Sequence, residues 1–167
     1  PTPEPTGTPT AEPTETPTAE PTEIETLYYD NGAIWYVGEM AGKLEHGQGT
    51  WYYPDGTILY EGEIGDGNPR GKGTAYYPVG TILYEGNWWD GKFHRQGTLY
   101  YDNGKIEYEG DWVEDIRHGH GTSYRRDGTI AYVGEWRRGE YHGWGILYDS
   151  DGTIIHEGVW EYGKAIN

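Results

Sequence analysis

The chain has 167 residues, no cysteine and a formal net charge of -16. The missing cysteines exclude disulfides and thiolate metal sites. The acidic balance argues against nucleic acid and against anionic membranes as partners, because both attract clusters of lysine and arginine. The sequence also lacks the run of about 18 apolar residues from which a membrane-spanning helix is built. Because it begins at Pro1 rather than at a methionine, we expect a processed form or a fragment.

Residues 1–25 form a segment rich in proline, threonine and glutamate. The octapeptide TPTAEPTE occurs twice in tandem, at 8–15 and 16–23, and the first large apolar residue is Ile24. We expect an extended tail, which serves either as a flexible linker or as the glycosylated stalk of an exported glycoprotein. The second role predicts an extracellular or cell-surface location and covalent glycans. The candidate O-glycosylation sites are Thr2, Thr6, Thr8, Thr10, Thr14, Thr16, Thr18 and Thr22.

A 24-residue period runs from residue 26 to the end of the chain. In each unit an aromatic position is followed two residues later by glycine and four residues later, in most units, by tryptophan. The first position holds Tyr36, Tyr60, Tyr84, Tyr108, Tyr132 and, in the sixth place, His156. The second position holds Gly38, Gly62, Gly86, Gly110, Gly134 and Gly158. A fixed period of this length predicts a solenoid in which each unit contacts its neighbours.

Within a unit the pattern has the period of two that is typical of β-strands. In the stretch 84–88 the tyrosine, glycine and tryptophan point to one face, and Glu85 and Asn87 to the other. Asp-Gly and Asn-Gly pairs mark the turns between units, as at 55–56 and 103–104. We therefore predict an all-β solenoid of β-hairpins. Its core would be a ladder of aromatic rings, because the glycine after each tyrosine leaves room for a ring from a neighbouring strand.

The residue pattern of the unit resembles that of a known repeat family. The segments YEGNWWDGKFHRQGTLYYDNG (84–104) and YVGEWRRGEYHGWGILYDSDG (132–152) are similar to the MORN repeat, whose core is Y-x-G-x-W-x-x-G-x-x-H-G-x-G. The copies depart from it at Met40 and Ile64 in the tryptophan position, at Arg70 in the histidine position and at Arg95 in the next glycine position. The resemblance implies a single-layer, MORN-type solenoid, a ladder of β-hairpins that acts as a scaffold, whose cohesion stacked rings must supply because a single sheet has no second sheet to pack against. The family's link to phospholipid is the part that the acidic charge opposes.

No motif in the chain points to catalysis, so we expect a protein that is not an enzyme and has no cofactor. Four units share a histidine position (His46, His94, His118 and His142). Equivalent residues lie two strands apart, roughly 9–10 Å, which is too far for two of them to bind one zinc ion. Outward carboxylates such as Glu61 and Glu85 indicate a solvated face. Tryptophans outside the repeat pattern are the candidates for stacking a ligand: Trp35, Trp51, Trp89 and Trp144.

The repeats start and stop in mid-unit. After the tail (1–25), the solenoid (26–167) would consist of a half unit at 26–35, five full units at 36–155 and a half unit at 156–167, in which no second strand follows the first. The two halves would complete a hairpin between neighbouring molecules, which predicts a head-to-tail homopolymer, a fibre. The alternative is a monomeric surface scaffold that binds a protein or carbohydrate. The expected self-association residues are Thr26, Leu27, Tyr28, Tyr29, His156, Glu157, Val159 and Trp160.

Overall fold

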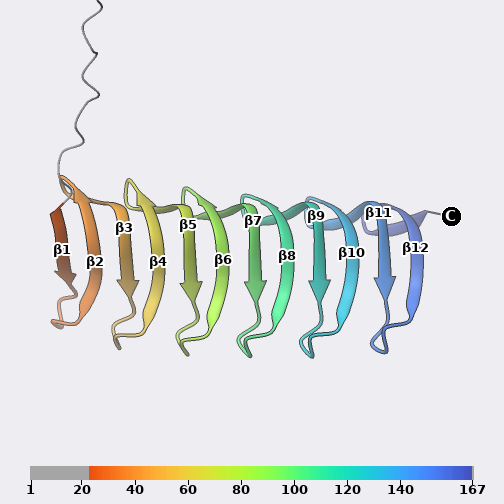
Figure 1. The fold of residues 1–167 in the computed structure, drawn as a ribbon, viewed down its shortest axis with the longest axis horizontal. Coiled ribbons are helices and arrows are strands. Elements are labelled where there is room, and N and C mark those ends of the chain that lie inside the picture. Colours follow the sequence, from red (N-terminus) through yellow and green to blue (C-terminus); the bar gives the residue numbers. More distant parts are fainter. Residues whose placement is uncertain (1–22, 167) are drawn as a thin grey trace, which may run out of the picture.

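The computed structural model describes residues 23–166, which form one antiparallel sheet of 13 strands (Figure 1). Every strand pairs with the next one in sequence, so the sheet grows hairpin by hairpin along one direction. This confirms the predicted all-β hairpin solenoid. No helix within 23–166 is long and apolar enough to cross a membrane. The strands are β1 (Glu23–Tyr28), β2 (Ile34–Ala41), β3 (Leu44–Tyr52), β4 (Ile58–Gly65), β5 (Asn68–Tyr76), β6 (Ile82–Trp89), β7 (Lys92–Tyr100), β8 (Ile106–Val113), β9 (Ile116–Tyr124), β10 (Ile130–Arg137), β11 (Glu140–Tyr148), β12 (Ile154–Glu161) and β13 (Lys164–Ile166).

The two ends of the sheet differ from the sequence expectation. At the start, the segment Glu23–Glu25 already belongs to β1 and pairs with β2, so the sheet begins before residue 26. At the other end, the short strand β13 pairs with Val159, Trp160 and Glu161 of β12. The prediction that no second strand follows in the last half unit is therefore wrong. The candidate glycosylation sites all lie outside the described residues.

A row of facing glycines crosses the sheet from β2 to β12. Gly86 of β6 stands opposite Gly97 of β7, which stands opposite Gly110 of β8, and the same pairing recurs in the other units. The row is glycine because an aromatic ring lies over it. A Cβ added to Gly97 would lie 2.0 Å from Oη and 2.3 Å from Cζ of Tyr84.

The core is the predicted ladder of aromatic rings on the tyrosine face. Tyr84 is fully buried and donates a hydrogen bond from its hydroxyl to the carbonyl oxygen of Asn87 at 3.0 Å. Phe93, from the start of the next strand, stacks on the Tyr84 ring with centroids 3.8 Å apart. Trp88 meets the same ring edge-on at 5.0 Å and donates from Nε1 to the carbonyl of Gly73 at 3.0 Å. Hydrogen bonds to backbone carbonyls thus satisfy the polar ends of these buried side chains.

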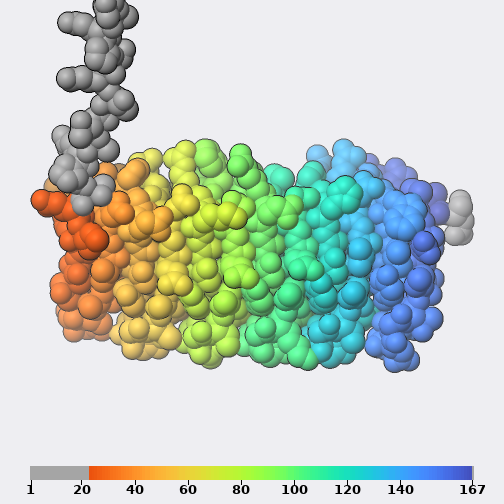
Figure 2. All heavy atoms as spheres, viewed as in Figure 1, coloured from red at the N-terminus to blue at the C-terminus, as the bar shows by residue number. Residues whose placement is uncertain are grey.

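The described residues make an elongated body with β1 and β12–β13 at opposite ends (Figure 2). Aromatic rings of the ladder cover one face of the sheet, and the other face carries the polar side chains. The candidate functional surfaces are therefore this polar face and the two end strands.

Candidate functional site

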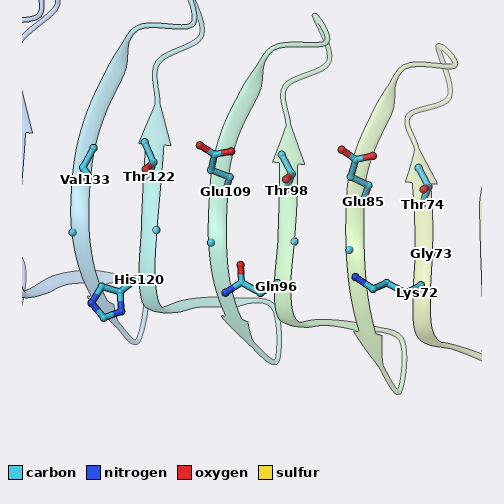
Figure 3. A pocket seen from close by; sticks show the side chains of 15 residues that line it. Lys72, Gly73, Thr74, Glu85, Gln96, Thr98, Glu109, His120, Thr122 and Val133 are labelled. Atoms are coloured by element: carbon cyan, nitrogen blue, oxygen red, sulfur yellow. The ribbon is translucent and has the colours of Figure 1, made fainter.

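A groove follows the glycine row on the polar face (Figure 3). Its volume is about 830 Å³, and glycine backbone forms its floor. Threonine and glutamate side chains lie along one side of it, whereas longer polar side chains lie along the other. The first side holds Thr74, Glu85, Thr98, Glu109, Thr122 and Val133, and the second Lys72, Gln96 and His120. The strip between these two rows carries no side chains on this face, because the Cβ position of each glycine in it points to the opposite, tyrosine face.

The carboxylates beside the groove are held by tyrosine hydroxyls. Tyr100 donates to Glu85, and Tyr124 donates to Glu109 in the next unit. Burial, followed by the bond to Glu85, raises the pKa of Tyr100 to about 12. Each carboxylate is therefore an acceptor within a repeated surface pattern. Within 23–166 no three histidine or acidic side chains gather closely enough to hold a metal ion.

The tryptophans outside the repeat pattern divide into two kinds. Trp35 and Trp51 are partly buried against the core, and the Trp51 ring lies 5.3 Å from that of Tyr60. Trp89 and Trp144 are 52% and 51% exposed. The second pair therefore has ring surface to offer a ligand, whereas the first pair contributes to the core.

Family comparison finds the same unit that the sheet displays. A model described as MORN repeat matches five consecutive segments, at 36–58, 60–82, 84–106, 108–130 and 132–154. The chain belongs to the MORN-repeat family. A search of curated proteins gave no match. MORN repeats are generally structural or binding repeats rather than catalytic ones, and here the MORN hairpins form a structural repeat scaffold.

Among residues 23–166, the two end strands of the MORN sheet have open edges. In this range β1 pairs with β2 alone, and β13 covers the outer edge of β12 only from Val159 to Glu161. Of the expected self-association residues, His156 and Glu157 belong to the part of β12 that β13 does not cover. Val159 and Trp160 already pair with β13, and Trp160 is 5% exposed.

At the β1 end, Thr26, Leu27 and Tyr28 lie on the open strand, whereas Tyr29 lies in the turn after it. The Tyr29 hydroxyl donates to the carbonyl of Tyr52 at 2.7 Å. Within one molecule the two edges are at opposite ends and do not meet (Figure 1). Glu25, which was not among the residues expected from the sequence, stands opposite Gly38 in the glycine row. Counting the 24-residue period back from Gly49 would have placed it there.

Proposed function

We propose that this MORN protein is a structural scaffold that self-associates head to tail through the ends of its sheet. The observation that supports the proposal is that β1 and the uncovered part of β12, at opposite ends of the sheet, hold matching places in the repeat. By the repeat period, β13 corresponds to Glu140–His142 and β1 to Gly143–Tyr148. A β1 from a neighbouring copy would therefore continue β13 along the edge of β12.

The residue pairs at such a joint would repeat those inside the sheet. Glu157 would face Thr26 of the next copy, as Glu85 faces Thr98 within one chain. His156 would face Leu27, as Tyr84 faces Leu99. Open strand edges present unpaired N–H and C=O groups that favour this kind of pairing. Because the contact joins two different ends, repeating it produces a filament unless it closes into a ring.

Two departures from the repeat at this joint complement each other. Inside the sheet a tyrosine ring covers the glycine of the following strand, and that position has no room for a Cβ, as at Gly97. At the joint the tyrosine position holds His156 and the glycine position holds Glu25. The smaller imidazole leaves space for a side chain, and His156 Nε2 is buried without a hydrogen-bond partner among residues 23–166. A carboxylate at this place would give that nitrogen a partner.

The setting of the scaffold belongs to the same proposal. The Pro/Thr-rich composition of residues 1–22 supports an extracellular or cell-surface protein with O-linked glycans on its threonines. Intact mass spectrometry of the native protein tests the glycans, since each hexose adds mass to the polypeptide. A native mass equal to that of the bare sequence would contradict the glycosylation part of the proposal and would not bear on the head-to-tail contact.

The test of the joint is a charge swap at the facing pair. Thr26→Glu places a carboxylate opposite Glu157 of the neighbour, and like charges on directly facing strands repel. We expect light scattering and electron microscopy to show filaments for the natural protein and short particles for this variant. The double variant T26E/E157K restores an attractive pair and should restore filaments. If the natural protein stays monomeric at all concentrations, the proposal fails. The alternative function, a monomeric scaffold that binds a partner along the groove, would then be favoured.

A further inference from the structure

A second pocket opens at the hairpin ends of β3 to β7 and is cationic, although the chain carries a net charge of -16. Its volume is about 710 Å³. The side chains that give it its character are His46, Arg70, Trp89, His94 and Arg95. The carboxylate that also lines it, Glu63, accepts a hydrogen bond from the backbone N–H of Lys72 at 3.0 Å. The arginines thus face no free acidic partner within the pocket lining.

The positive charge arises from two linked departures in the third unit. In other units a glycine leaves room for a carboxylate of the facing strand, and a Cβ at Gly71 would lie 2.2 Å from Glu63 Oε2. The third unit has Arg95 in the glycine position and Asn87 in the carboxylate position. The Asn87 amide donates instead to the carbonyl of Gln96 at 2.9 Å. Relative to Glu63 and Gly71 of the second unit, the third unit thus loses a carboxylate and gains a guanidinium group at facing positions.

The fold itself does not favour arginine at this position. Arg95 has a φ of 53°, in the left-handed region that disfavours residues with a Cβ. Glycine occupies the equivalent position in the other four full units: Gly47, Gly71, Gly119 and Gly143. Backbone strain of this kind is often retained where the side chain serves a function.

Arg70 and Trp89 form a recognition surface beside Arg95. The Arg70 guanidinium carbon lies 4.4 Å from the centre of the Trp89 ring, and the indole is 52% exposed. Arg70 replaces the histidine found at this position in other units. His94 Nδ1 is buried without a hydrogen-bond partner among residues 23–166, so the sheet leaves hydrogen-bonding capacity here unused. Guanidinium groups bind carboxylates in a fixed geometry, and an exposed indole offers a flat surface to an apolar ring such as proline.

We propose that this pocket binds the acidic, proline-rich N-terminal segment, residues 1–22, of the same chain or of a neighbouring copy. Glutamates of the segment would pair with Arg70 and Arg95, and an adjacent proline would pack on Trp89. The segment carries no lysine or arginine, and each octapeptide holds a Glu-Pro step, at 12–13 and 20–21. Its charge is therefore complementary to the pocket and repels the acidic remainder of the surface. The proposal goes beyond head-to-tail association and does not depend on it.

The segment is long enough to reach the pocket. An extended chain of 22 residues spans about 70 Å at about 3.3 Å per residue. From β1 to β6 the sheet advances five strand spacings, roughly 24 Å at about 4.8 Å each. The same length also allows the segment to reach across to an adjacent copy.

The test uses paramagnetic relaxation in the full chain, made in the Thr26→Glu background so that end-to-end association does not enter. The chain has no cysteine, so Thr10→Cys gives one site for a nitroxide label. We expect the label to broaden the backbone amide signals of Lys72, Asn87 and Gln96 and the Trp89 indole signal. Mixing labelled protein with unlabelled, ¹⁵N-enriched protein tells whether the segment comes from the same or a neighbouring copy, and either origin supports the proposal.

The decisive variant is N87E/R95G, which restores the residues of the second unit and removes the strained φ. It should fold with a Tm at least as high as before, and the broadening should be lost. Arg138→Gly is the matched control, because Arg138 also has a positive φ, of 55°, and lies outside the pocket lining. This control should keep the broadening. Broadening that is absent, spread evenly over the sheet, or unchanged in N87E/R95G would overturn the proposal.

Discussion

At the residue scale, the sheet depends on pairing one large ring with one missing side chain. Tyr84 lies over Gly97, and Tyr132 lies over Gly145, where an added Cβ would be 2.1 Å from the tyrosine Oη. The ring supplies apolar burial, and its hydroxyl binds a backbone carbonyl. Neither residue of such a pair can change alone, since the ring needs the space that glycine leaves.

Gly97→Ala should lower the free energy of unfolding by about 3 kcal/mol, because the new methyl collides with a buried ring that cannot move away. Urea denaturation followed by circular dichroism measures the loss. Gly104→Asn is the control, since Gly104 has a φ of +80° and nothing within 4 Å of an added Cβ. Asparagine tolerates that backbone, so this change should cost less than about 1 kcal/mol. Equal losses for the two variants would contradict the role of the ring.

The buried tyrosines predict a loss of stability at alkaline pH. Burial, with Glu45 and Glu39 nearby, raises the pKa of Tyr36 from 10.0 to about 12, and burial likewise raises the pKa of Tyr132 to about 12. The folded state therefore holds these protons more tightly than the unfolded chain does. The stabilisation is complete below pH 10 and is lost as the pH rises toward 12.

Urea unfolding at a series of pH values measures this decline. In the double variant Y36F/Y132F the decline should be shallower, because phenylalanine has no ionisable hydroxyl. A free energy of unfolding that stays constant up to pH 12 would show that the folded state does not bind these protons more tightly.

At the element scale, the hairpin is the unit of the fold and its two strands have different tasks. The even-numbered strands from β6 to β10 each carry a tyrosine and a tryptophan of the core. In β7 and β11 a register shift at a bulge accompanies a second aromatic, Phe93 or Tyr141, that stacks on the preceding tyrosine ring. Among residues 23–166 the last hairpin has only the short β13 as its second strand.

The residues at the proposed joint predict that one substitution weakens assembly and that a second one restores it. His156→Tyr alone would place a full tyrosine ring over Glu25 of the neighbour, where the internal hairpins have room only for glycine. We expect this variant to assemble more weakly than the natural protein. Adding Glu25→Gly recreates the internal pair and should restore assembly. Sedimentation velocity over a range of concentrations measures both, and identical behaviour of the single and double variants would contradict the joint.

At the scale of the whole molecule, the sheet grows in one direction, and each unit contacts only its neighbours. The backbone of the polar face repeats from unit to unit, but its side chains vary, as Lys72, Gln96 and His120 do at one position, and Arg95 is the departure at the cationic pocket. A molecule built in this way has two distinct ends, so the ends and the irregular units are where we expect specific contacts.

Filament geometry follows from this growth. If β13 and β1 share one strand position, the 13 strands occupy 12 positions per molecule. At about 4.8 Å per strand the axial rise per subunit should be roughly 58 Å. Cryo electron microscopy of filaments measures it. A rise shorter by several strand spacings would mean that the molecules overlap side by side instead of joining end to end.

The sequence by itself determined the repeat architecture, because a 24-residue period with strand alternation indicates a solenoid and the similarity of the unit to the MORN repeat implies a ladder of hairpins. It also predicted that the in-register tyrosines and tryptophans form the core. Other features depend on register, which the bulges shift within each hairpin and which a linear pattern does not reveal. Only the tertiary structure placed Glu25 in the glycine row, added β13 to the edge of β12, and separated Trp89 from the partly buried Trp51. It also brought Arg70 of β5 onto Trp89 of β6, because cross-strand neighbours are distant in sequence and meet only when the strands pair.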